Sequence, residues 1–182
     1  QLSQGSHPAQ QRLIFEELVA HQVSLLSRRA YIQQIEAPRI SASRQFAKQL
    51  LSSLPFEMTN AQKRVSKEIV QDLKLNKPML RLVQGDVGAG KTLVAGVAAC
   101  HALEEGWQVA LMAPTEILAE QHYLNFKKWF EPLGLSVSWL SGKQKGKARA
   151  AAEQAIVDGT AHLVVGTHAL FQDNVRFAKL GL

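Results

Sequence analysis

The chain has 182 residues, of which 46% are apolar and 20% are charged, and these values are ordinary for a soluble globular protein. No run of 18 apolar residues occurs, so the sequence predicts no membrane-spanning segment and no membrane partner. The formal net charge of +6 permits a polyanionic partner without proving one. The single cysteine, Cys100, cannot form an internal disulfide, which favours a reducing, cytoplasmic compartment.

The sequence of the first 53 residues predicts helices without a catalytic constellation. Apolar residues at helical spacing indicate one long helix from residue 8 to about residue 35, which Pro38 closes. A shorter helix is expected over about 43–51. We expect these helices to form a connector or brace between domains, with an interaction helix as the alternative. Because residues 1–6 are polar and lack an initiator Met or a signal-peptide pattern, we expect an internal piece of a longer protein.

A boundary follows at Pro55, which pushes its neighbour out of helical geometry. Thr59 and Gln62 then form the Thr-x-x-Gln pattern of a capping box, which predicts the start of a new helix. Two roles stay open for Gln62: its side chain can reach back to the Thr59 backbone N–H, or it can read adenine N6 and N7 in a bidentate way. Phe56 can stack on the base or can be a hydrophobic plug.

The most specific pattern is the glycine-rich stretch 85–92. It reads Gly-Asp-Val-Gly-Ala-Gly-Lys-Thr, which matches the phosphate-binding pattern of a Gly, four free positions and then Gly-Lys-Thr. Residues 79–83 before it are largely apolar and predict a buried strand, and the alanine-rich residues 93–99 after it predict a packed helix. Strand, loop and helix therefore follow the order that nucleotide binding needs, and a chance glycine-rich turn is the weaker alternative.

Each residue type in this loop has a chemical reason. The three glycines adopt backbone angles that other residues resist, and they keep Cβ atoms away from the phosphates. Backbone N–H groups of the loop and of the helix start can converge on the β- and γ-phosphates. Lys91 can bring a compact positive charge to the same oxygens, and the Thr92 hydroxyl can hold Mg²⁺, so these two are the predicted catalytic residues. The predicted nucleotide contacts are Phe56, Gln62, Gly85, Asp86, Val87, Gly88, Ala89, Gly90, Lys91 and Thr92.

Strands and helices alternate from residue 79 onward. Beyond the first strand, strands are expected at 108–113, 135–140 and 162–166, and helices at 116–130 and 149–157, with a helical start at 167–171. This alternation predicts an α/β fold in which a parallel sheet is covered by helices and ligands bind at the carboxyl ends of the strands.

Small and hydroxyl residues follow the later strands at those carboxyl ends. Each such turn can donate hydrogen bonds to phosphate oxygens, although an ordinary helix N-cap is the simpler alternative for any one of them. A basic run at residues 143–149 reads either as a solvated face or as contact with a nucleic-acid backbone. Zinc is not expected, because the histidines show no metal-ligand spacing. The candidate residues of these turns are Pro114, Thr115, Glu116, Gly142, Lys143, Thr167 and His168.

Together these motifs resemble those of superfamily 2 helicases, and within them the bacterial RecG-type DNA helicases that remodel replication forks. The resemblance runs from residue 54 to residue 182. It rests on Leu-Pro-Phe-x-Met-Thr-x-x-Gln (54–62), the loop 85–92, Ala-Pro-Thr-Glu-Ile-Leu-Ala-Glu-Gln-His (113–122), Gly-Lys-Gln-Lys-Gly-Lys-Ala-Arg (142–149) and Gly-Thr-His-Ala-Leu (166–170).

The resemblance implies a RecA-like P-loop NTPase lobe over residues 54–182, preceded by a helical connector over residues 1–53. It implies that Gln62 reads adenine with Phe56 near the base, that the loop 85–92 holds ATP and Mg²⁺, and that the turns named above touch the DNA backbone. Ala89 replaces the serine common in this loop, and we expect little consequence because the backbone N–H acts there.

The resemblance also implies parts that lie outside this sequence. An acidic Asp-Glu-x-His motif is expected past Leu182, together with a second motor lobe and a DNA-splitting wedge. The implied activity is ATP-driven helicase or translocase action on forked and branched double-stranded DNA in recombination and repair, by a monomer in the bacterial cytoplasm, associated with the nucleoid. A transcription-repair coupling translocase is the nearest alternative, and a P-loop nucleotide-binding module or kinase is the alternative from another class.

Overall fold

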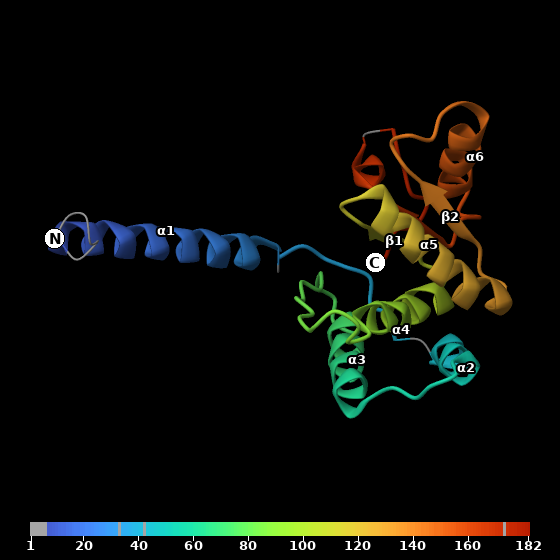
Figure 1. The fold of residues 1–182 in the computed structure, drawn as a ribbon, viewed down its shortest axis with the longest axis horizontal. Coiled ribbons are helices and arrows are strands. Elements are labelled where there is room, and N and C mark those ends of the chain that lie inside the picture. The colour runs from blue at the N-terminus through green and yellow to red at the C-terminus, as the bar shows by residue number, and fades with distance from the viewer. Residues whose placement is uncertain (1–6, 33, 42, 173) are drawn as a thin grey trace.

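A computed structural model describes residues 7–32, 34–41, 43–172 and 174–182. A long helix extends away from an α/β body, in which a small sheet and the helices packed on it lie beside a group of further helices (Figure 1). The helices are α1 Pro8–Ile32, α2 Gln45–Ser53, α3 Asn60–Leu73, α4 Lys91–Glu104, α5 Glu116–Phe130 and α6 Gly146–Val157. The strands are β1 Val109–Met112, β2 Val137–Leu140 and β3 Leu163–Gly166, and two short 3₁₀ helices are η1 Glu131–Leu133 and η2 His168–Phe171.

The three strands form one parallel sheet in the order β1-β3-β2. Leu163 of β3 pairs with Val109 of β1 on one side and with Val137 of β2 on the other, so β3 is the central strand. Its side chains alternate between two apolar clusters: Leu163 and Val165 pack with α4 and α5, whereas Val164 packs with Ile156 of α6. The sheet therefore has helices on both faces, as the alternation of strands and helices predicted.

The predicted strand at residues 79–83 is wrong. No backbone hydrogen bond joins these residues to another described segment, although Met79 and Val83 face the core and Leu82 is 88% exposed. The free edge of β1 is occupied instead by the C-terminal residues: the Ala110 N–H donates to the Leu182 carbonyl at 2.9 Å. The apolar run was taken as a buried strand, but only one side of it is buried, and a strand also needs a partner, which local sequence does not specify.

The other predicted elements agree with the structure, with shifts at their ends. Helix α5 has the predicted bounds 116–130, and α1 ends at Ile32, near the predicted residue 35. Helix α6 begins at Gly146 rather than at residue 149, so part of the basic run lies on its first turn. Gly159 has φ 73°, the left-handed geometry in which glycine ends a helix at low cost.

The two N-terminal helices differ in their packing. Helix α1 has no buried residue and projects from the body (Figure 1). Helix α2 instead buries Ala47 and Leu50 in the same core as α4. Gly96 of α4 makes this packing close, because a Cβ there would lie 3.3 Å from the Trp129 ring of α5 and 3.8 Å from Leu50. The division at residues 53/54 stays a prediction, since α2 shares the core of the residues that follow it.

The N-terminus of α2 is capped from another helix. Arg44 at the N-cap position has φ 74° and makes no side-chain cap. The Glu104 carboxylate of α4 accepts hydrogen bonds from the Gln45 backbone N–H at 2.9 Å and from the Ser43 hydroxyl. Burial by itself raises the pKa of Glu104, but the hydrogen bonds from Ser43 and from backbone N–H groups outweigh it, and its pKa lies below the ordinary value.

This geometry predicts a pH-dependent loss of stability in Glu104→Gln. A carboxyl whose folded pKa is depressed stabilises the fold above its unfolded pKa, and this stability disappears as the pH falls through the folded pKa. We expect the substitution to cost about 1–2 kcal/mol at pH 7. Urea unfolding at pH 7 and at pH 3 measures it, with Glu120→Gln on the exposed side of α5 as the control. An equal cost at both pH values would contradict the capping role.

Candidate nucleotide site and a polar edge of the sheet

The loop 85–90 lies between the unpaired residues 79–84 and the start of α4. Gly88 and Gly90 have φ of 82° and 76°, values that side-chain-bearing residues rarely adopt. Gly90 is the N-cap of α4, and no side chain caps this helix end. The first-turn N–H groups of this fourteen-residue helix therefore have no side-chain cap, a geometry that suits an anion.

Lys91 lies over the loop in the first turn of α4. Its ammonium donates to the carbonyl oxygens of Gly85 and Asp86, both at 2.7 Å. Oxygens of a phosphate can replace these two carbonyls without a long movement of the side chain, because the donor geometry of an ammonium is flexible. Thr92 follows on the same turn and is half-buried. The predicted pair Lys91 and Thr92 is thus placed at the helix end that can hold an anion.

Both polar atoms of the Gln62 side chain form hydrogen bonds. Its Oε1 accepts from the Thr59 N–H at 2.8 Å, while its backbone N–H donates to the Thr59 hydroxyl at 3.3 Å, so the predicted capping box is confirmed. Its Nε2 donates to the Ala89 carbonyl at 2.9 Å, a contact that the sequence did not indicate. A Cβ on Gly90 would lie 2.4 Å from this nitrogen, so Gly90 is needed for space as well as for its φ. Adenine recognition by Gln62 stays a prediction.

A pocket of about 430 Å³ joins these groups. Its lining includes the loop residues Gly85, Asp86, Gly88 and Ala89 together with Gln62, Val65, Val83 and Lys91, whereas Val87 is fully exposed and does not line it. The donor set of backbone N–H groups, an amide and an ammonium fits a polyphosphate. The structure does not bring Phe56 to this pocket: it is 55% exposed and lines a separate groove, so its predicted base contact stays a prediction.

The three strands deliver the other predicted turns to one edge. Met112 and Leu140 both align with Gly166 in the parallel registers, so the turns that follow them start side by side. The Thr115 hydroxyl accepts from the Leu118 N–H at 3.3 Å and caps α5, which is the simpler of its two predicted roles. Lys143 forms an ion pair with Glu116 at 2.5 Å, and this contact raises the pKa of Lys143 through the hydrogen bond and the charge of Glu116.

The sequence analysis did not predict a polar cluster around a single arginine, Arg149, behind this edge of the sheet. Arg149 was assigned to a basic run, but its side chain is only 18% exposed and pairs with Glu153 at 2.8 Å. The spacing of four residues between them was the available signal. Elsewhere in the core, burial lowers the pKa of His101 and raises the pKa of Cys100 to about 12. Within the described ranges, no cluster of metal-ligating side chains occurs.

A P-loop at the start of a helix beside a parallel sheet defines a nucleotide-binding α/β protein. The DEAD/DEAH box helicase family matches residues 59–182, and the chain belongs to this family. The predicted RecG-type resemblance is confirmed, since the chain is 57% identical over 181 residues to "ATP-dependent DNA helicase RecG" of Escherichia coli (strain K12), covering all of this chain and 26% of that protein.

Two further similarities support this assignment. The RecG helicase of Aquifex aeolicus (strain VF5) is 41% identical over 93% of this chain and 22% of its own length. A solved structure described as RecG bound to a three-way DNA junction matches with a TM-score of 0.84 and 38% identity, over 93% of this chain and 23% of that one. The chain therefore spans about a quarter of the length of the relatives it matches. None of the described helices combines the length and the apolar character that a transmembrane span requires.

The two contacts of Gln62 can be separated by substitution. Gln62→Glu keeps an acceptor for the Thr59 N–H but removes the donor to Ala89, whereas Gln62→Ala removes both. We expect Gln62→Glu to weaken nucleotide binding several-fold while the unfolding midpoint changes little, and Gln62→Ala to lose in addition about 1 kcal/mol of helix capping. Fluorescent-nucleotide titration and urea unfolding measure the two effects. Equal stability losses in both variants would contradict this separation.

Proposed function

We propose that the protein containing this chain is an ATP-driven double-stranded DNA helicase or translocase that remodels replication forks and branched DNA. Fork reversal and branch migration in recombination and repair are the reactions this implies, in the bacterial cytoplasm at the nucleoid. The observation that carries the proposal is identity of 57% over the whole chain with RecG helicases, combined with a complete phosphate loop.

Nucleotide binding is assigned to the residues around the loop. Backbone N–H groups at the start of α4 bind phosphate oxygens, and Lys91 exchanges its two carbonyl partners for them. The Thr92 hydroxyl would hold Mg²⁺, which supplies positive charge to the β- and γ-phosphates when bound. Gln62 links the start of α3 to the loop, so a nucleotide that moves Ala89 also changes the environment of this amide.

Residues 180–182 support a proposal for the acidic motif. They lie along β1 in parallel, where Leu180 bridges to Gln108 and Leu182 accepts from Ala110. An apolar cavity of about 210 Å³ lies between this segment and the unpaired residues 79–83, with Lys91 in its lining. We propose that the acidic Asp-Glu-x-His motif continues this segment toward Lys91 and Thr92.

We further propose that residues 54–182 are the first motor lobe and residues 1–53 the connector to a wedge domain. A second motor lobe is the remaining partner. We expect a protein that lacks both this lobe and the acidic motif to bind nucleotide weakly and to hydrolyse it hardly at all.

The DNA contact is proposed at the carboxyl edge of the sheet. Its polar groups come from the turns after β1, β2 and β3, which start at one edge because the strands are parallel. The proposed contacts are Pro114, Thr115, Glu116, Gly142, Lys143, Thr167 and His168. Glu116 carries a negative charge that repels phosphate, so it acts only indirectly, by pairing with the Lys143 ammonium that would otherwise be free to bind a phosphate.

Two alternative functions are distinguished by what stimulates ATP hydrolysis. A transcription-repair coupling translocase typically has Pro-Thr-Thr where this chain has Pro-Thr-Glu, and the pairing of Glu116 with Lys143 gives the glutamate a role here. A P-loop kinase would need a phosphate-acceptor site. Stimulation of ATP hydrolysis by forked DNA supports the helicase, dependence on RNA polymerase supports the coupling factor, and indifference to DNA supports the kinase.

The first test of this function is Lys91→Ala in the full-length protein. Removal of the ammonium deprives the β- and γ-phosphates of their nearest side-chain charge, and we expect fork-stimulated ATP hydrolysis to fall at least about a hundredfold. The rate is measured with saturating forked DNA, and Lys77→Ala, an exposed lysine ahead of the loop, is the control. Turnover at the wild-type rate would overturn the assignment of the loop.

The second test is Glu116→Gln, which removes the charge that pairs with Lys143. The freed ammonium can then neutralise a DNA phosphate, so we expect tighter binding of forked DNA by the full-length protein at low salt. The slope of log K against log salt concentration should steepen by about one unit. Fluorescence anisotropy at several salt concentrations measures both, with Glu120→Gln as the control on the same helix. An unchanged slope would show that Lys143 does not reach a phosphate.

A further inference from the structure

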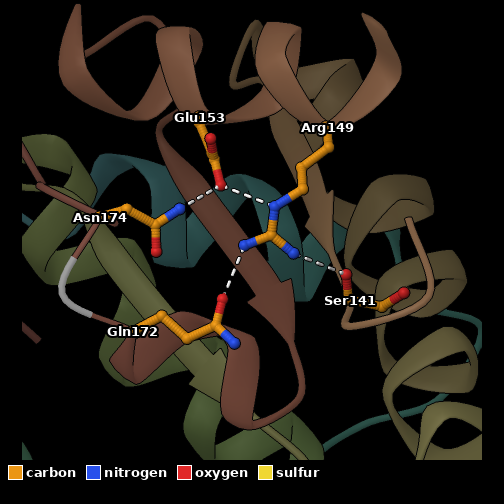
Figure 2. Close-up of polar contacts among 5 residues, drawn as sticks. All are labelled: Ser141, Arg149, Glu153, Gln172 and Asn174. Atoms are coloured by element: carbon orange, nitrogen blue, oxygen red, sulfur yellow. Dashed lines mark hydrogen bonds and ion pairs between the residues drawn. The ribbon is translucent and has the colours of Figure 1, made fainter. Parts of the chain in front are cut away.

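Arg149 is the centre of a polar cluster behind the sheet edge (Figure 2). Its Nε donates to Glu153 Oε1 at 2.8 Å, and one terminal nitrogen donates to Gln172 Oε1 at 2.7 Å. The other terminal nitrogen contacts the Ser141 carbonyl at 3.4 Å. Asn174 Nδ2 donates to the same Glu153 oxygen at 2.8 Å. The guanidinium thus uses all three of its nitrogens within one cluster.

The partners come from three separate parts of the chain. Ser141 directly follows β2 and begins the turn that carries Lys143. Gln172 is the C-cap of η2, which begins at His168 after its N-cap Thr167 and follows β3 in the chain. Arg149 and Glu153 themselves lie on α6, between these two turns in sequence. The cluster therefore joins the turn after β2 to the segment after β3, as Figure 2 shows for Ser141 and Gln172 on opposite sides of the guanidinium.

Burial distinguishes this cluster from an ordinary helix-surface ion pair. The side chains of Arg149 and Glu153 are 18% and 24% exposed, whereas the similarly spaced pair of Arg12 and Glu16 on α1 is 79% and 55% exposed. An isolated pair four residues apart stabilises only its own helix. The additional bonds to Ser141 and Gln172 fix one segment relative to another, which a pair within α6 cannot do.

We propose that Arg149 is a positioning residue for DNA binding, which holds the Lys143 turn at a fixed spacing from the Thr167–His168 turn. The inference rests on the proposed function, because the spacing matters only if both turns contact the DNA backbone. Two turns held rigidly can bind neighbouring phosphates without first being ordered. The Arg149 cluster therefore raises the affinity for DNA and leaves the nucleotide pocket unchanged.

The planar shape of the guanidinium makes the proposal testable by Arg149→Lys. Lysine keeps the charge and can pair with Glu153, but a single ammonium cannot span Ser141 and Gln172. Gln172→Ala is the second variant: Gln172 is exposed, so its truncation removes the link across the turns while α6 stays intact. The matched control is Arg12→Lys, which alters an arginine–glutamate pair of the same spacing on α1.

The experiment measures ATP hydrolysis by the full-length protein as a function of forked-DNA concentration. We expect Arg149→Lys to raise the DNA concentration for half-maximal stimulation about five- to tenfold, and Gln172→Ala to raise it by a smaller factor. The maximal rate, the DNA-free rate and the KM for ATP should stay at wild-type values. The double variant should resemble Arg149→Lys alone, because both changes break the same link.

Three outcomes would bear on the proposal in different ways. A half-stimulating concentration equal to wild type in both variants overturns it. A fall of the DNA-free and DNA-stimulated rates by the same factor, with a lowered melting temperature, also overturns it and assigns Arg149 to the stability of α6. If wild-type hydrolysis itself ignores forked DNA, then the proposed function fails, and this result is distinguishable because it does not depend on any Arg149 variant.

Discussion

Parallel pairing of β3 with both of its neighbours is the constraint on which the rest of the structure depends. Because Gly166 aligns with Met112 on one side and Leu140 on the other, three chain segments leave the sheet at the same edge. Each strand of a parallel sheet needs a crossover connection, and α5 and α6 provide these connections on either side of the buried strand. The polar turns are adjacent because the hydrogen-bonded register of the sheet ends the three preceding strands side by side.

Features that depend on residues close together in the sequence were predicted correctly. The capping box at Thr59, the helix at 116–130 and the glycine loop all depend on residues within a few positions of one another, and the structure has each of them. The strand predicted at 79–83 failed because a strand is defined by a distant partner, and residues 180–182 occupy the edge of β1 instead. The same reason explains Arg149, whose partners Ser141 and Gln172 lie 8 and 23 positions away.

The candidate sites show the same division between local and distant information. Residue types and spacing predicted the loop around Lys91, since phosphate binding needs its donors on consecutive residues. The link from Gln62 to Ala89 spans 27 positions and was visible only in three dimensions. Glu116 and Lys143 were each predicted as contacts of an external partner, yet they contact each other, because turns from neighbouring strands bring opposite charges together.

The absence of a side chain at Gly96 sets how closely three helices approach. Helices α2, α4 and α5 meet at this crossing, and a Cβ at position 96 would already be in tight contact with the Trp129 ring. Helix α4 begins at Lys91 and ends at Glu104, which caps α2. The end of α4 that caps α2 and the end that follows the glycine loop therefore belong to one helix, and a larger residue at position 96 would have to displace α2 or α5 from it.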